Sequence, residues 1–125
     1  MINGGNVTVY VADMDRAVAF YRDALGLTLA FRAGNEWASI DAGGCLQLGL
    51  HPAGPRTPAA GHAGAITVGL AVDEPIERVV SVLQDRGVAF RGPVVDDGGR
   101  LKLAFFTDPD GNELYLAEQL GRPGP

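Results

Sequence analysis

The amino-acid sequence repeats one order of structural elements twice, and this repeat constrains the fold more than any other feature. In each copy a strand-like segment is followed by a helix-like segment that ends at a glycine, and then by three further strand-like segments. Residues at the starts of the two copies match at a spacing of 61 positions, and residues near their ends match at a spacing of 68. We therefore predict an α+β fold of two tandem βαβββ modules. The alternative is two α+β halves whose similarity is coincidental.

The first module is predicted over about residues 5–51. Residues 7–11 alternate as Val-Thr-Val-Tyr-Val, which is typical of a half-buried strand. Asp13 is the expected N-cap of a helix that ends at Gly26, a residue suited to the C′ position. Turns that contain glycine then separate three expected strands. Those strands are residues 27–32, 36–41 and 45–50.

The second module is predicted over about residues 65–119, after a linker at about 52–64 that is rich in Pro, Gly and Ala. It opens with an alternating strand near Val68. Asp73 is then expected to cap a helix that ends at Gly87. The remaining segments are strands at residues 88–91, 100–107 and 113–117, followed by a C-terminal tail at 120–125.

Composition and charge limit the classes of function. A chain of 125 residues suits one domain. It contains no run of about 18 uncharged apolar residues, as a membrane span needs, and no signal-peptide pattern, so we expect a cytoplasmic protein without a membrane partner. The net charge of −5 argues against a nucleic-acid partner. Cys45 is the only cysteine, which excludes an internal disulfide and a cysteine-rich zinc site.

Two stretches resemble the signatures of the vicinal oxygen chelate (VOC) superfamily, which includes glyoxalase I, bleomycin-resistance proteins and extradiol dioxygenases. Residues 11–27 resemble the pattern V-x-D-x-x-x-A-x-x-FY-x-x-x-LG, and residues 107–116 resemble the ending DPDGN-x-x-E-L. The resemblance covers about residues 5–119, as a single VOC domain. It implies that the two modules form a curved mixed sheet with a concave cleft, and that the chain is a homodimer.

The resemblance also implies where a metal would be bound. Metal-using members place one ligand on the first strand and one on the last strand of each module, and these positions are Asn6, Gln47, Thr67 and Tyr115 here. Alternation along the strands turns these residues toward the cleft. Those members carry His, Glu or occasionally Gln there, because divalent ions prefer carboxylate or imidazole ligands. Only Gln47 matches, so we expect neither a metal nor another cofactor.

Six residues are candidate ligand-binding residues: Asn6, Trp37, Gln47, His51, Thr67 and Tyr115. Trp37 is either a wall for a flat or cationic ligand or a core aromatic residue. Asn6 and Gln47 either hold a polar ligand or bond to each other. Tyr115 either orients a ligand or plugs the cleft. His51 is either an acid or base at the cleft rim or a solvated side chain.

These residues favour a metal-free binding protein of the bleomycin-resistance type, with no catalytic residue, in which a dimer sequesters a drug or metabolite and thereby confers antibiotic resistance. The ligand is expected to be small and either cationic or aromatic. Two alternatives remain open. One is a metal-dependent lyase, isomerase or dioxygenase with unusual ligands such as His51, Gln47 and Glu113. The other is a metal-free enzyme that uses Tyr115 or His51 for acid–base chemistry.

Overall fold

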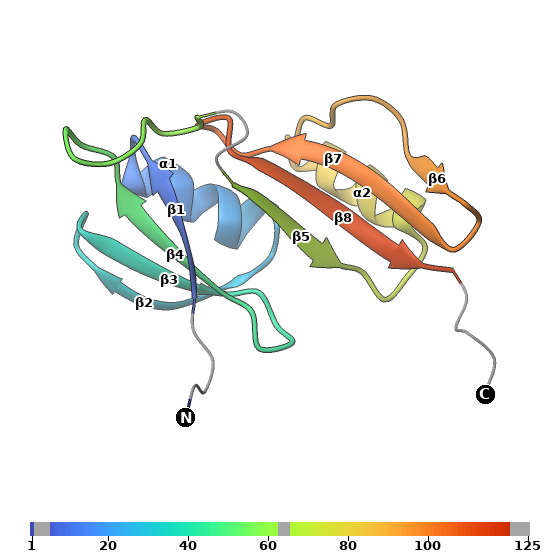
Figure 1. Ribbon diagram of the computed structural model, residues 1–125, viewed down its shortest axis with the longest axis horizontal. Helices are drawn as coiled ribbons and strands as arrows, with labels where there is room; N and C mark the ends of the chain where they lie inside the picture. Colours follow the sequence, from blue (N-terminus) through green and yellow to red (C-terminus); the bar gives the residue numbers. More distant parts are fainter. Residues whose placement is uncertain (2–5, 63–65, 121–125) are drawn as a thin grey trace. The chain divides into compact units, whose positions relative to one another are not determined.

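The computed structural model describes residues 1, 6–62 and 66–120, which form two compact units (Figure 1). The first unit comprises residues 1–66 and the turn 108–112, and the second comprises residues 67–107 and 113–125. Residues 2–5, 63–65 and 121–125 lie outside the described part. With them lie residue 5 of the predicted first module, the end of the predicted linker, residue 65 of the predicted second module and most of the predicted tail. No helix in the described part is long and apolar enough to span a membrane.

The first unit contains a four-stranded mixed sheet, sheet A, and a helical region on one of its faces (Figure 1). Its elements are β1 (Val7–Val11), α1 (Met14–Ala19), the π-helical segment η1 (Phe20–Ala24), β2 (Thr28–Ala33), β3 (Trp37–Asp41) and β4 (Gln47–Pro52). The strand order is β1-β4-β3-β2, with β1 parallel to β4 and the other pairs antiparallel. Asp13 caps α1 by accepting a hydrogen bond from the Arg16 N–H, as predicted.

The core of the first unit lies between sheet A and its helical region. Side chains alternate along each strand, so one face of the sheet is apolar and packs on the helix. The buried residues of this core are Val9, Val11, Met14, Ala17, Val18, Tyr21, Ala38, Ile40, Leu48 and Leu50. We call the opposite face the open face of sheet A; the described residues of this unit place no helix on it.

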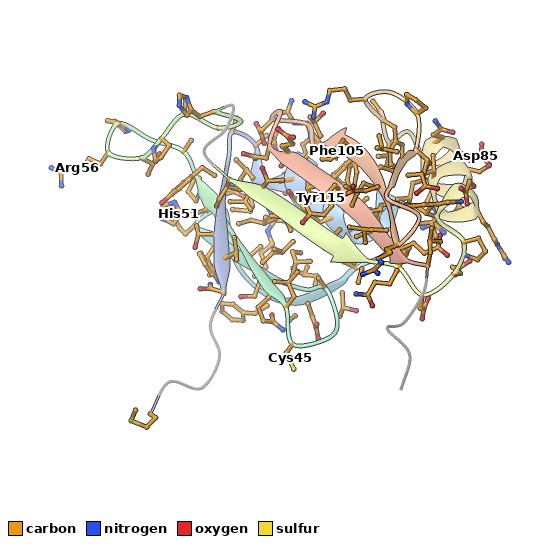
Figure 2. The ribbon with its side chains drawn as sticks, turned by 45° about the vertical axis from the view of Figure 1, so that its right-hand side comes forward. Cys45, His51, Arg56, Asp85, Phe105 and Tyr115 are labelled. Carbon is orange, nitrogen blue, oxygen red and sulfur yellow. The ribbon has the colours of Figure 1, made fainter. Side chains whose placement is uncertain are left out.

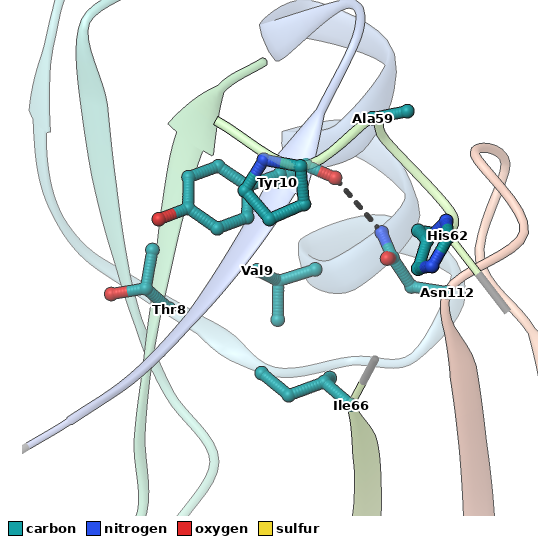
Figure 3. A pocket seen from close by; sticks show the side chains of 8 residues that line it. Thr8, Val9, Tyr10, Ala59, His62, Ile66 and Asn112 are labelled. Carbon is teal, nitrogen blue, oxygen red and sulfur yellow. Dashed lines mark hydrogen bonds between the residues drawn. The ribbon is translucent and has the colours of Figure 1, made fainter. Parts of the chain in front are cut away.

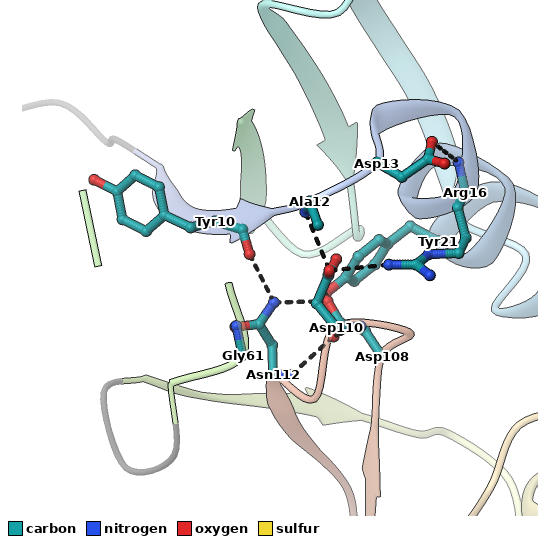
Figure 4. A network of polar contacts seen from close by, with 9 residues as sticks. All are labelled: Tyr10, Ala12, Asp13, Arg16, Tyr21, Gly61, Asp108, Asp110 and Asn112. Carbon is teal, nitrogen blue, oxygen red and sulfur yellow. Dashed lines mark hydrogen bonds and ion pairs between the residues drawn. The ribbon is translucent and has the colours of Figure 1, made fainter. Parts of the chain in front are cut away.

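The turn 108–112 is joined to the helical region by hydrogen bonds between buried groups (Figure 4). Tyr21 is fully buried and donates its hydroxyl to Oδ2 of the buried Asp108 at 2.9 Å. Asp108 also accepts from the backbone N–H groups of Asp110 and Asn112, at 3.0 and 2.8 Å. Burial, and then the negative charge of Asp108, raise the pKa of Tyr21 well above its ordinary value. Tyr21 is therefore a protonated hydrogen-bond donor in the folded protein.

A second carboxylate of this turn, Asp110, meets the start of the helical region. Its Oδ1 accepts from the Ala12 N–H and from the Arg16 guanidinium, both at 3.1 Å. Its Oδ2 is buried and has no hydrogen-bond partner among the described residues. Asp108 and Asp110 together anchor the turn on the first unit.

The second unit repeats the order of the first around sheet B, which confirms two βαβββ modules. Its elements are β5 (Thr67–Ala71), α2 (Ile76–Asp85), β6 (Val95–Asp97), β7 (Leu101–Thr107) and β8 (Glu113–Gln119). The strand order β5-β8-β7-β6 matches that of sheet A. Helix α2 packs against β7 and β8, with Ile76 and Leu83 buried. The other face is the open face of sheet B.

Two local predictions for the second unit are wrong. Residues 88–91 form no strand but only a bridge between Phe90 and Phe106, and β6 begins later. Gly92, with φ +81, and Pro93, which has no N–H, interrupt the ladder at this point. Asp73 does not cap α2, whose first residue Ile76 instead donates its N–H to the Glu118 carboxylate at 3.0 Å.

Candidate functional site

The open face of sheet A is the first candidate site, because it gathers four of the six predicted site residues. The ladders pair Tyr10 with His51 and Gln47 with Asp41 on this face. Asn6 lies beside them, with its side-chain nitrogen 3.0 Å from a Cβ built on Gly49. The face therefore carries Asn6, Trp37, Gln47 and His51 together, with Thr8, Tyr10, Ser39, Asp41 and Gly49 between them.

Trp37 lies flat along this face rather than in the core. A Cβ added to Gly49 would overlap atoms of the Trp37 ring, so the indole crosses the neighbouring strand in contact with its backbone. The indole N–H donates to the Ser39 hydroxyl at 2.8 Å, which fixes the ring orientation. The side chain is half-buried. Trp37 therefore lies on the open face of sheet A and is not one of the buried core residues.

His51 stands between two aromatic rings. Its ring centroid is 5.7 Å from that of Tyr10 and 6.4 Å from that of Trp37, edge to face in both cases. Its Nδ1 lies 2.8 Å from the carbonyl oxygen of Pro52. Since a carbonyl only accepts, Nδ1 carries the hydrogen, and in the neutral ring Nε2 is left as an acceptor. Figure 2 shows His51 near the end of β4.

The amides of Gln47 and Asn6 have no hydrogen-bond partner among the described residues, so they do not bond to each other there. Gln47 is half-buried at the start of β4, and Asn6 is exposed just before β1. Each amide has donors and an acceptor to offer to a ligand.

The open face of sheet A is neutral to acidic. Strands β1, β3 and β4 contain no Lys or Arg, and Asp41 is their one carboxylate. The cation of β2, Arg32, lies on the helical side of the sheet, where it bonds to Asp15 of α1. One oxygen of Asp41 accepts the Gly43 N–H at 2.8 Å. The charge of this face therefore suits a neutral or cationic ligand and disfavours an anionic one.

The open face of sheet B holds the other two predicted site residues. The Tyr115 ring lies across Gly69, with its hydroxyl oxygen 2.5 Å from a Cβ built there. Thr67 is exposed and is paired with Glu113, whereas Tyr115 is paired with Gly69. Figure 2 shows Tyr115 beside Phe105 of β7, and their ring centroids are 5.6 Å apart.

Arg91 and Glu113 add charge to the same face. The Arg91 guanidinium is 5.6 Å from the centroid of the Phe105 ring, within range of a cation–π contact. It also pairs with the Glu113 carboxylate at 3.0 Å. The sequence alone did not indicate this pair, because the two residues are far apart in the chain and belong to different elements.

The donor set does not fit a divalent metal ion. The four superfamily positions offer two amides, a hydroxyl and a phenol, none of which is a carboxylate or imidazole. Of the alternative ligands, Glu113 is paired with Arg91 and the Nδ1 of His51 with the backbone. No group of three or more His, Cys, Asp and Glu residues is placed to hold a metal within residues 6–62 and 66–120.

Sequence reasoning did not select Tyr10, Ser39 and Gly49, although the sequence holds a signal for Tyr10 and another for Gly49. Alternation along β1 places Tyr10 on the same face as Asn6. A glycine inside a strand, such as Gly49 or Gly69, often marks a close approach of another group. Trp37 and Tyr115 are the groups that approach here.

A family model described as Glyoxalase/Bleomycin resistance protein/Dioxygenase superfamily matches residues 5–116. The chain is 28% identical over 130 residues to "Probable lactoylglutathione lyase, chloroplastic" from Arabidopsis thaliana, which covers 96% of the chain. The chain spans only 37% of that relative's length.

Solved structures share this fold over nearly the whole chain. TnmS3, an antibiotic-binding protein from Streptomyces sp. CB03234, is 28% identical, with a TM-score of 0.76 over 95% of this chain and 97% of that one. A glyoxalase/bleomycin resistance protein from Catenulispora acidiphila is 26% identical, with a TM-score of 0.71 over 94% and 98%. A superfamily member from Sphaerobacter thermophilus, 23% identical, has a TM-score of 0.79 over 95% and 98%.

Proposed function

The chain belongs to the glyoxalase/bleomycin resistance protein/dioxygenase superfamily, and on this premise we propose that it binds a small aromatic drug or metabolite and sequesters it without transforming it. The three rings of Trp37, His51 and Tyr10 on the open face of sheet A carry this proposal. The similarity to the antibiotic-binding protein TnmS3 supports it. Antibiotic resistance by sequestration is the biological role that follows.

The chemistry of this face defines the ligand class. A flat ring against Trp37 gains about 0.5–1.5 kcal/mol from ring–ring geometry in addition to the burial of apolar area. A cationic ligand gains about 0.5–2 kcal/mol from a cation–π contact, depending on desolvation. The unpartnered amides of Gln47 and Asn6 supply hydrogen bonds to polar atoms at the edge of the ring. We therefore propose a flat molecule, neutral or cationic, with a polar edge.

Titration of the protein with flat aromatic antibiotics tests the proposal, because Trp37 is the only tryptophan and reports through its emission. Neutral and cationic members of the panel are expected to change the emission saturably, and anionic members to bind more weakly. By calorimetry, Trp37→Leu is expected to weaken binding roughly tenfold or more. Val82→Ala, which shortens an exposed side chain of α2, serves as the control. If no member of the panel changes the Trp37 emission, the proposal is wrong.

Recovery of the ligand separates sequestration from catalysis. After long incubation we expect the ligand to be recovered unchanged, with or without added Zn²⁺, Ni²⁺, Mn²⁺ or Fe²⁺. Turnover that is lost in His51→Asn would favour a metal-free enzyme instead. Lactoylglutathione lyase activity that depends on an added ion would favour the activity named for the plant relative.

We also propose that the chain acts as a cytoplasmic homodimer without a nucleic-acid partner. The superfamily resemblance supports the dimer, and the net charge of −5 supports the absence of nucleic acid. Light scattering after size-exclusion chromatography is expected to give the mass of two chains. A mass of one chain at every concentration would contradict the dimer.

A further inference from the structure

A small pocket lies along the outer edge of β1, where the segment 58–62 passes β1 (Figure 3). Its volume is about 110 Å³. Strand β1 is one of the two edge strands of sheet A, so among the described residues this side of it pairs with no other strand of the sheet. The described residues that line the pocket are Thr8, Val9, Tyr10, Pro58, Ala59, His62, Ile66 and Asn112.

The wall opposite β1 is held in place by Gly61 and Asn112. The Gly61 N–H donates to the Asn112 side-chain oxygen at 3.2 Å. The Asn112 amide nitrogen donates to the carbonyl oxygen of Tyr10 at 3.0 Å, as Figure 3 shows, and to Asp108 Oδ2 at 2.9 Å. Gly61 has φ +73, and a Cβ there would overlap the Asp110 carbonyl oxygen, so the backbone passes very close to the turn. The pocket is therefore formed before any ligand binds.

The lining of the pocket is mostly apolar and carries no acid, Lys or Arg among the described residues. Val9 is fully buried at this edge, and Pro58, Ala59 and Ile66 add apolar surface. The polar groups are few. The Thr8 hydroxyl and the His62 ring are side chains that offer a hydrogen bond to an occupant. Pockets with apolar walls and a few polar groups are typical small-molecule sites.

We infer that this pocket binds a compact, uncharged ring that carries one hydrogen-bonding group, and phenol is the simplest probe of that class. An apolar cavity of roughly 150 Å³ is known to hold benzene, so a space of about 110 Å³ admits at most one such ring. Among the described residues no Asp, Glu, Lys or Arg lines the pocket, which favours an uncharged occupant. The pocket lies at the edge of sheet A and shares Thr8 and Tyr10 with its open face. Val9, Ala59 and Ile66 line the pocket but are not among the open-face residues, so their methyl groups report its occupancy separately from binding beside Trp37.

Methyl NMR with phenol tests this site directly. Saturable shifts are expected for the methyl groups of Val9, Ala59 and Ile66, with a Kd on the order of 1 mM for so small a ligand. Ala59→Leu is expected to fill the pocket and weaken phenol binding roughly tenfold or more. Ala19→Leu is the matched control, because Ala19 is an exposed alanine on α1 outside the pocket. Ile66→Phe fills the pocket from another wall, and circular dichroism checks that each variant is folded.

Three outcomes would overturn the site. The first is the absence of saturable shifts at these methyl groups in the unmodified protein. The second is phenol binding that persists unchanged in both folded filling variants. The third is a phenol-dependent change in Trp37 emission without shifts at the pocket methyls, which would place phenol on the open face of sheet A and leave the proposed function intact.

Discussion

The indole of Trp37 lies across the α-carbon of Gly49, on the neighbouring strand of sheet A, in a space that no side chain could share. The candidate binding surface therefore depends on an absent side chain as much as on an aromatic one. Tyr115 and Gly69 repeat this relationship in sheet B. A strand glycine costs conformational entropy, and in both sheets the closely packed ring offsets that cost.

Gly49→Ala is expected to displace the Trp37 ring and break its hydrogen bond to Ser39. The expected loss of stability is about 1–3 kcal/mol, as for other overpacked sites. Trp37 emission should shift to the red as the ring becomes more exposed, and binding of flat ligands should weaken. Urea unfolding and emission spectra measure these effects. Gly54→Ala is the matched control, since nothing lies within 4 Å of its added Cβ.

Tyr21→Phe is expected to lower the free energy of unfolding by about 1–3 kcal/mol, because it removes a buried donor from Asp108. Asp108 keeps its three other donors, which limits the loss. Tyr10→Phe removes a hydroxyl for which no described residue is a hydrogen-bond partner, so it should change stability far less. Equal losses in the two variants, measured by urea unfolding, would show that the Tyr21–Asp108 bond contributes little.

Stability is expected to fall at high pH because of Tyr21. The pKa of Tyr21 is raised in the folded protein above its ordinary value of 10.0, first by burial and then by Asp108. Above pH 10 the unfolded chain loses this proton while the folded chain keeps it, so the free energy of unfolding decreases. Below that pH the contribution is complete. Unfolding curves for the unmodified protein should therefore decline more steeply above pH 10 than those for Tyr21→Phe, and parallel declines would contradict this cause.

Gly61→Ala is expected to be more disruptive than Gly54→Ala, by about 2 kcal/mol or more. Gly61 combines φ +73 with a Cβ position that overlaps the Asp110 carbonyl, whereas Gly54 has open space around it. Thermal unfolding compares the two variants. Loss of phenol shifts at Val9 should accompany the change, because Gly61 holds one wall of the edge pocket.

Removal of divalent ions is expected to leave ligand binding unchanged. The superfamily metal positions hold Asn6, Gln47, Thr67 and Tyr115, which include no carboxylate or imidazole. Calorimetric titration measures the ligand affinity before and after treatment with a chelator. Elemental analysis of both samples checks that the ions were removed. A loss of affinity that one added ion restores would show that a metal takes part.

Much of the fold could be predicted because it is encoded locally. The alternation of apolar residues and the glycines in turns predicted the bounds of five strands to within two residues: β2, β3, β4, β7 and β8. Asp13 caps α1 as predicted. The errors came from longer-range effects. Asp73 is a good capping residue by type, but Glu118, from a strand distant in sequence, bonds to the first N–H of α2 instead. Residues 88–91 alternate like a strand, but the chain turns at Gly92 before a ladder forms.

The candidate site could be predicted only as a set of positions. Alternation of side chains along the strands predicted that Asn6, Gln47 and Tyr115 face away from the helices. It could not predict whether their polar groups form hydrogen bonds within the protein. Among the described residues the two amides do not bond to each other, and the ladder pairs Thr67 with Glu113 and Tyr115 with Gly69. It also adds Arg91, whose partners Phe105 and Glu113 are remote in sequence.

The sequence by itself determined the repeat and the α+β class, and it showed that the superfamily metal positions carry no carboxylate or imidazole. Periodicity and residue type are properties of the chain alone. Tertiary structure alone decided that Trp37 lies on the open face, that His51 stands beside Tyr10, and that Tyr21 meets Asp108. These contacts depend on strand register and on side chains brought together from distant segments, which no local pattern encodes.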